Sequence, residues 1–201
     1  QVVDATCPFV KKIHNIVSRS SSLPLVVFGD KTHPEVEGIL SYSDAETHVV
    51  SCADELSELD FGEKEVVLVS QTTQKLTEWK LCQNKMRDLF TNAKIYDTIC
   101  STTENRQVSA KALAAQVDAM IVIGGAESSN SKKLYLTAKE VCPRTWFIES
   151  PEEVRSLPLG QAMKLGITAG ASTPSSLIEE VYTIMAEEKI LNVGEATDTE
   201  D

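Results

Sequence analysis

Two cysteines occupy matching places in a repeated pattern. Cys7 ends the stretch Asp4-Ala-Thr-Cys and Cys100 ends Asp97-Thr-Ile-Cys, each directly before a segment with helical periodicity. N–H groups at the start of a helix stabilise a thiolate, the form of cysteine that binds metals and performs redox chemistry. Taken singly, each residue is also explained as a small buried hydrophobe. Because both recur at the same place in the pattern, we interpret Cys7 and Cys100 as candidate metal ligands.

The overall use of cysteine excludes several other thiol chemistries. Five cysteines are too few and too unevenly spaced for a disulfide framework, and no Cys-x-x-Cys pair points to a thioredoxin-type or zinc-ribbon site. A [4Fe–4S] cluster needs at least three cysteines, so one ligand would have to lie outside this chain. The opening Gln-Val-Val-Asp-Ala is typical of the second half of a buried strand, and we interpret the first residue as a cut. The other cysteines are interpreted as structural: Cys52, Cys82 and Cys142.

His33 and Glu35 stand in the densest polar loop, Gly29–Gly38. Pro34 suits the first helical position, which places His33 at or near the N-cap. A histidine there can donate to an anion, and Glu35 in the first turn can transfer a proton at the same site. A first-turn glutamate also complements the helix dipole, but we favour a functional role for the loop as a unit. Two further polar residues are interpreted as structural or surface residues: His14 and Glu37.

Small hydroxyl and amide side chains follow other apolar runs. Ser128-Ser-Asn-Ser131 precedes a helical segment, and residues 170–174 read Gly-Ala-Ser-Thr-Pro. Beside the N–H groups of a helix, such side chains form an anion cradle without a fixed positive charge. The alternative is an ordinary N-cap with spare serines. Thr72 and Thr73 add hydroxyls to the same edge of the predicted sheet.

Alternating strands and helices must position these residues. Short apolar runs predict strands over 24–28, 48–50, 65–69, 93–96, 119–123, 145–148 and 164–168. Helical periodicity predicts helices over 9–19, 75–90, 104–116, 131–141 and 174–187. This alternation is typical of an α/β fold with parallel sheets.

The two halves of the chain align with each other at a spacing of about 95 residues, as in a duplicated unit. Each matched feature follows a strand and leads into a helix, so the features share the carboxyl edge where open α/β sheets bind ligands. We therefore expect two repeated small domains, over 1–96 and 97–187, whose polar loops face one cleft. An acidic tail or linker is expected over 188–201.

The composition of the chain excludes several classes of partner and function. Nineteen Lys and Arg against 30 Asp and Glu give a net charge of −11, which argues against nucleic acid or anionic lipid as a partner. No apolar run approaches the roughly 20 residues of a membrane helix and no secretory leader opens the chain, so a cytoplasmic protein is expected. No nucleotide-binding glycine motif occurs. A phosphorylated ligand beside a metal centre fits best; the alternatives are a non-catalytic, metal-free, two-lobed module binding a phosphorylated ligand, and a purely structural duplication.

Taken together, the motifs resemble the 4-hydroxy-3-methylbut-2-enyl diphosphate reductases, iron–sulfur enzymes of the methylerythritol phosphate route to isoprenoids. The matching stretches are Asp4–Pro8, His33–Gly38, Gln71–Thr73, Cys100 with Asn105–Gln107, Ser128–Ser131 and Thr168–Ser172. The resemblance implies three similar α/β domains around a central [4Fe–4S] cluster. Only the second and third are visible here, two thirds of a pseudo-threefold trefoil, so this chain alone is expected to be inactive.

The resemblance also implies roles for individual residues. Cys7 and Cys100 are cluster ligands, and Glu35 is the proton donor, with Thr72 as a second catalytic residue. The implied substrate-binding residues are His33, Thr73, Ser128, Ser129, Asn130 and Ser172. The reaction is a reductive dehydroxylation that gives isopentenyl and dimethylallyl diphosphate, with ferredoxin or flavodoxin as electron donor. Both donors are acidic, so with a net charge of −11 in this chain we expect the missing domain to supply a basic docking face.

Overall fold

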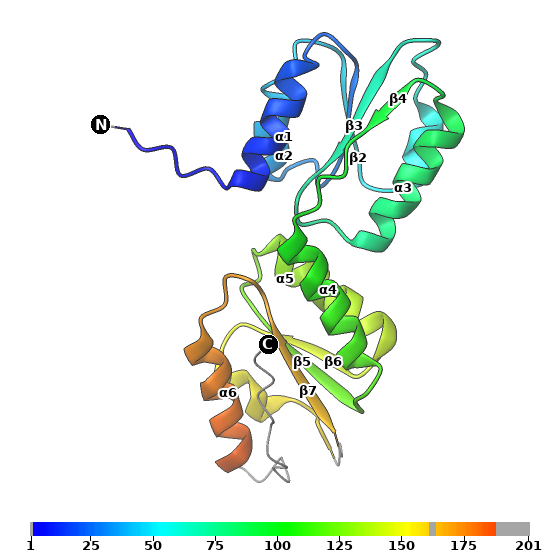
Figure 1. The fold of residues 1–201 in the computed structure, drawn as a ribbon. Helices are drawn as coiled ribbons and strands as arrows, with labels where there is room; N and C mark the ends of the chain where they lie inside the picture. The colour runs from blue at the N-terminus through cyan, green and yellow to red at the C-terminus, as the bar shows by residue number, and fades with distance from the viewer. Residues whose placement is uncertain (1, 161–163, 188–201) are drawn as a thin grey trace. The chain divides into compact units, whose positions relative to one another are not determined.

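The computed structural model describes residues 2–160 and 164–187, and the predicted tail over 188–201 lies outside them. The chain divides into two compact units between Glu104 and Asn105 (Figure 1). The sequence-based boundary at 96/97 falls eight residues earlier, just after the last strand of the first unit. Within the described residues, no helix combines the length and apolar character needed to cross a lipid bilayer.

The first unit is an open parallel sheet with strand order β2-β1-β3-β4. Its elements are α1 (Pro8–Arg19), β1 (Leu25–Phe28), α2 (Pro34–Leu40), β2 (Thr47–Val50), the 3₁₀ helix η1 (Ala53–Glu58), β3 (Val66–Ser70), α3 (Leu76–Leu89) and β4 (Ala93–Ile95). In the register of the sheet, Phe28 at the carboxyl end of β1 is paired with Val50 and Ser70. The loops that follow β1 and β3 therefore leave the sheet side by side.

Both faces of this sheet are covered, which explains why its central strands are apolar throughout. Successive strand residues point to opposite faces, so Val27 and Val69 pack with Ile13 and Val36 of α1 and α2. Val26 and Leu68 pack on the other side, where α3 contributes Trp79, Cys82 and Met86. Figure 1 shows α1 and α2 on one side of the sheet and α3 on the other.

The second unit repeats this plan. Its elements are α4 (Ser101–Ala114, whose first turn belongs to the first unit), β5 (Ala119–Ile123), α5 (Ser129–Val141), β6 (Thr145–Ile148), η2 (Pro151–Ser156), β7 (Leu165–Ala169) and α6 (Ser175–Glu187). The described strands form a parallel sheet in the order β6-β5-β7, which matches β2-β1-β3. Met120 and Val122 pack on α4 and α5, whereas Ile121 and Ile123 pack on α6 and η2.

The expected α/β class with two parallel sheets is thus confirmed, and each predicted strand from 24–28 onward is present within a few residues. The strand expected over the first five residues is wrong for the part described. Residues 2–7 lie in no helix or strand, and Val2 and Val3 are 98% and 80% exposed. A strand forms only where another strand receives its hydrogen bonds, and no described strand pairs with this segment.

Candidate functional site

Glu35 and Thr72 form the centre of the site in the first unit. The Glu35 carboxylate accepts the main-chain N–H of Thr72 at 2.7 Å on one oxygen and the Thr72 hydroxyl at 2.9 Å on the other. Glu35 lies in the first turn of α2 and Thr72 two residues beyond β3, so the contact joins the loops after two adjacent strands. Thr72 is buried and Glu35 half-buried. The carboxylate is thereby held in one orientation beside a hydroxyl that can share its proton.

His33 caps the same helix, as the sequence predicted. Its Nδ1 accepts the N–H of Glu35 at 3.1 Å, and Pro34 occupies the first helical turn. An imidazole nitrogen that accepts a hydrogen bond carries no proton, so the neutral ring bears its hydrogen on Nε2. The ring of His33 can therefore donate Nε2–H to an anion while its other nitrogen holds α2.

Gln71 ties the two loops together, a role that the sequence analysis did not assign. Its side-chain oxygen accepts the N–H of Asp30 at 2.9 Å and its amide nitrogen donates to the Thr73 hydroxyl at 3.0 Å. Gln71 is fully buried. The approach of the loops requires glycine at position 29, because a Cβ there would lie 2.7 Å from Val36 and 3.2 Å from Gln71. The sequence signal that could have identified Gln71 is its place as a polar residue directly after an apolar strand.

Cys7 and Cys100 take equivalent places before helices. The carbonyl of Cys7 accepts the N–H of Lys11 in α1, and that of Cys100 accepts the N–H of Glu104 in α4, both at 2.9 Å. Cys7 is exposed, Cys100 is half-buried, and all five cysteines are free thiols. The main-chain N–H of Cys100 also donates to the carbonyl of Thr72 at 3.1 Å, so the backbone of Cys100 is tied to the Glu35–Thr72 pair.

These two thiols satisfy only part of the needs of an iron–sulfur cluster. Both are reduced, near the surface and at helix starts, which suits cluster ligation. Among the described residues, no three His, Cys, Asp or Glu side chains are grouped so as to hold a metal. The described residues therefore offer two thiols to such a cluster.

Two other ionisable groups of the first unit, Cys82 and Asp4, have shifted pKa values that their surroundings explain. Burial raises the pKa of the Cys82 thiol to about 12, with a smaller contribution from Cys52. Lys11, 2.7 Å from Asp4, and the N–H of Thr6 hold the pKa of the Asp4 carboxyl well below its usual range. Asp4 thus tethers the segment before Cys7 to α1.

The second unit holds the predicted cradle residues around the start of α5. Ser128 is the N-cap, and its Oγ accepts the N–H of Ser131 at 3.2 Å and the Ser131 hydroxyl at 2.9 Å. The ordinary N-cap interpretation is therefore true of Ser128. Asn130 differs, because its Nδ2 is buried and has no hydrogen-bond partner among the described residues. A buried donor without an acceptor costs about 1–3 kcal/mol, so an anion bound there would relieve it.

Ser172 lies exposed in the loop between β7 and α6. This loop is tied to the end of β5, since the Thr173 hydroxyl donates to the carbonyl of Ile123 at 3.1 Å. Gly124 and Gly170 both abut Ser131, and a Cβ at position 124 would lie 2.6 Å from the Cβ of Ser131. The loops after β5 and β7 therefore meet at the carboxyl end of the sheet, as expected.

The sequence-predicted residues thus form two groups, one in each unit. His33, Glu35, Thr72, Thr73 and Cys100 belong to the first unit, as does Cys7 on α1. The cradle residues Ser128, Ser129, Asn130 and Ser172 belong to the second. That both groups face one cleft stays a prediction.

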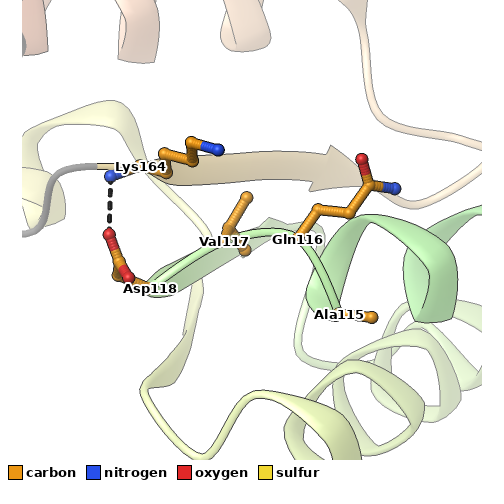
Figure 2. Close-up of a pocket in the computed structure, with 5 residues that line it drawn as sticks. All are labelled: Ala115, Gln116, Val117, Asp118 and Lys164. Carbon is orange, nitrogen blue, oxygen red and sulfur yellow. Dashed lines mark hydrogen bonds between the residues drawn. The ribbon is translucent and has the colours of Figure 1, made fainter.

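A surface pocket elsewhere in the second unit contains none of these residues. Figure 2 shows Ala115, Gln116, Val117, Asp118 and Lys164 around it, with the N–H of Lys164 donating to the Asp118 carboxylate at 2.8 Å. It lies where β5 and β7 begin, at the opposite end of the sheet from Gly124 and Gly170. Parallel sheets bind ligands at the carboxyl ends of their strands, so we do not assign the site to this pocket.

Comparison with known proteins identifies the family of this chain. The family described as "LytB protein" matches residues 1–186. This chain belongs to the LytB family. Curated relatives named 4-hydroxy-3-methylbut-2-enyl diphosphate reductase are 42% identical over 188 residues in Clostridioides difficile and 44% identical over 183 residues in Geobacter sulfurreducens. These alignments cover 92% and 90% of this LytB chain but 67% and 64% of the relatives, so the chain spans about two thirds of their length.

Solved structures extend the likeness to the fold. The structure of the E-1-hydroxy-2-methyl-but-2-enyl-4-diphosphate reductase from Plasmodium falciparum matches 92% of this LytB chain with a TM-score of 0.85 and 27% identity. The match covers 59% of that protein. A second reductase, described as the terminal enzyme of the non-mevalonate pathway, matches 93% of the chain and 68% of its own length, with 38% identity and a TM-score of 0.57.

Proposed function

We propose that this LytB chain is part of a 4-hydroxy-3-methylbut-2-enyl diphosphate reductase and that Glu35 delivers one of the two protons that its reaction consumes, the one that leaves with the hydroxyl oxygen as water. In the reaction, a C–O bond breaks and two electrons and two protons enter, giving water and isopentenyl or dimethylallyl diphosphate. The observation that carries the proposal is the double hydrogen bond from Thr72 to the Glu35 carboxylate. It supports an acid held in fixed orientation at the carboxyl end of the sheet, beside a second hydroxyl.

Loss of a hydroxyl group needs an acid close to the departing oxygen, because hydroxide is a poor leaving group. Glu35 would protonate that oxygen, and the Thr72 hydroxyl would orient both the carboxyl group and the substrate hydroxyl. The burial of Thr72 supports this role, since few waters compete for its hydroxyl. Thr73, held by the Gln71 amide, would contact the same end of the substrate.

The diphosphate would bind to the other group of residues. Asn130 offers a buried amide donor without a partner among the described residues, and Ser128 and Ser129 lie beside it at the start of α5, where backbone N–H groups favour an anion. Ser172, in the loop after β7 of the same unit, would add a further donor. Neutral donors and helix termini hold an anion without a net positive charge, so the charge of −11 is no obstacle.

The cofactor would be a [4Fe–4S] cluster, with Cys7 and Cys100 as two of its ligands. When bound, such a cluster supplies the two electrons and a Lewis-acidic iron. The described residues contain no third ligand next to these cysteines. We therefore propose that turnover requires the rest of the enzyme and that this chain alone is inactive.

The electron donor would be a small acidic protein such as ferredoxin or flavodoxin. The helix that follows Cys7 favours this assignment, because α1 carries Lys11, Lys12 and Arg19 and no acidic residue, in contrast to the chain as a whole. Lys12 and Arg19 are exposed. Charge complementarity of this kind steers association more than it adds affinity.

The decisive experiment replaces Glu35 in the complete, anaerobically prepared enzyme. Glu35→Gln keeps the shape of the side chain but cannot donate an acidic proton, so turnover should fall by about 10²–10⁴-fold. Binding of inorganic pyrophosphate should change little. Glu37→Gln, on the same short helix and exposed, is the matched control. Equal losses of turnover and affinity would make Glu35 a binding residue, and an iron-free, inactive wild-type protein with intact pyrophosphate binding would support the metal-free binding module instead.

A further inference from the structure

Arg106 belongs to the stretch Asn105-Arg106-Gln107, which has no part in the function proposed above. It lies in the second turn of α4 and is half-buried. One terminal nitrogen of its guanidinium group donates to the carbonyl oxygen of Ala169 at 2.9 Å, a contact between residues 63 positions apart. Ala169 is the last residue of β7. The side chain thus reaches from a helix to the carboxyl end of a strand.

Among the described residues, no counterion accompanies the guanidinium group of Arg106. Its Nε is buried and has no hydrogen-bond partner among the described residues, and no described carboxylate forms an ion pair with it. Burying a charged group with so few partners is unfavourable. The contact with Ala169 is therefore a poor source of stability, and its position needs another explanation.

That position is next to the loop that carries Ser172. Directly after Ala169, the N–H of Gly170 donates to the carbonyl of Ile123 at 2.9 Å, and Thr173 donates its hydroxyl to the same carbonyl at 3.1 Å. The strand end is thus held by β5 through its backbone and by α4 through Arg106. Gly170 in turn abuts Ser131, the neighbour of Asn130.

At its other end, α4 begins directly after Cys100. Arg106 lies six positions after Cys100 in the sequence. The helix that follows a candidate metal ligand therefore also anchors, within the second unit, the strand from which the candidate anion loop departs.

We propose that Arg106 is a positioning residue for anion binding: it clamps the end of β7 to α4 and so fixes residues 170–173, which present Ser172. It does not touch the substrate. The inference rests on the proposed function for the identity of the anion, a diphosphate, but the clamp itself is independent of any reaction.

The test uses the complete protein with Arg106→Met, which keeps an unbranched apolar stem but removes the donors and the charge. Hydrogen exchange of the amides in 170–173 and the Kd for inorganic pyrophosphate are measured together. We expect faster exchange in that loop and a Kd raised about tenfold or more, while iron content and the exchange of the β1 and β3 amides stay as in the wild type. Arg106→Lys, which retains the charge and a donor, should recover part of the affinity.

Lys111→Met is the matched control, because Lys111 is an exposed cation on the same helix. Unchanged exchange and unchanged pyrophosphate affinity in the Arg106→Met protein would overturn the clamp. If Arg106→Met does not fold, Arg106→Gln takes its place, because this substitution also removes the charge. Wild-type exchange in 170–173 together with wild-type pyrophosphate affinity in that variant would overturn the clamp. Absence of reductase activity in the wild type would refute the proposed function but leave the exchange and pyrophosphate measurements valid for Arg106.

Discussion

The main-chain N–H of Cys100 donates to the main-chain carbonyl of Thr72 at 3.1 Å. Because the N–H of Thr72 itself donates to Glu35, one residue lies between the candidate metal ligand and the candidate acid. A displacement of Cys100 would therefore reach the candidate acid Glu35 through the backbone of one residue, Thr72. Substitutions at different positions should therefore affect proton transfer, iron binding, anion binding and packing separately.

Removal of the Thr72 hydroxyl should impair turnover. Thr72→Val has nearly the same shape and retains the main-chain bond to Glu35, but it loses the 2.9 Å hydroxyl contact. A hydrogen bond to a charged group is worth about 1.5–3 kcal/mol, so we expect kcat to fall by about ten- to a hundredfold in the complete enzyme. Thr72→Ser, which keeps the hydroxyl, should retain most activity. Equal kcat values for the Val and Ser variants would contradict a role for the hydroxyl.

Cysteine replacements should affect iron differently according to position. Cys7→Ser and Cys100→Ser should each lower the iron and sulfide content of the anaerobically prepared complete protein, together with its visible absorbance. Cys52→Ser should leave the iron content and the absorbance unchanged. Cys52 lies beside Glu55 at the start of η1, whereas the two candidate ligands precede α1 and α4. Full iron content in either of the first two variants would remove that cysteine from the ligand set.

The same thiols should differ in their reaction with an alkylating reagent in the metal-free protein. Cys7 is exposed and Cys100 half-buried, whereas burial raises the pKa of Cys82 to about 12 and keeps it protonated. We expect Cys7 to be alkylated first at pH 8 and Cys82 only after unfolding, as mass spectrometry of the digested protein can determine. Since the unfolded pKa of a thiol is about 8.5, the buried Cys82 should also lower stability as the pH rises from about 8.5 to 12. Early alkylation of Cys82 would show that its burial is not maintained.

Two serine replacements should separate anion binding from helix capping. Ser172→Ala removes an exposed hydroxyl, so it should weaken binding of inorganic pyrophosphate without changing the free energy of unfolding. Ser128→Ala should weaken binding and also destabilise the protein by about 1 kcal/mol, because Ser128 caps α5. Titration calorimetry and denaturant unfolding measure the two quantities. Unchanged pyrophosphate affinity in both variants would refute the cradle.

Adjacent glycines should respond differently to the same change. A Cβ at Gly124 would lie 2.6 Å from the Cβ of Ser131, so Gly124→Ala should destabilise the second unit by about 1–3 kcal/mol. At Gly125 the nearest atom is 4.0 Å away, and Gly125→Ala should be tolerated. The urea concentration at the midpoint of unfolding compares the stabilities of the two variants. Equal midpoints would show that the loop after β5 is not closely packed on α5.

Local sequence pattern was enough to predict the helices and strands, and with them which candidate residues follow a strand or begin a helix. The apolar runs at 25–28 and 119–123 require burial on both faces, and a proline after His33 or serines before a helical stretch specify where helices begin. The duplicated order of strands and loops placed Cys7 and Cys100 at equivalent helix starts. The segment over residues 2–5 shows the limit, because its strand-like composition could not supply a strand to pair with.

Contacts between distant residues depended on the tertiary structure. Glu35 meets Thr72 across 37 residues, Asp30 meets Gln71 across 41, and Arg106 meets Ala169 across 63. Propensity and spacing say which side chains follow a strand, but hydrogen-bond geometry depends on strand order, register and close approach at glycines such as Gly29 and Gly124. The sequence by itself therefore determined the α/β class, the duplication and the kinds of residue in the site. Only the folded chain decided which of them touch, because those contacts form when the sheet brings adjacent loops together.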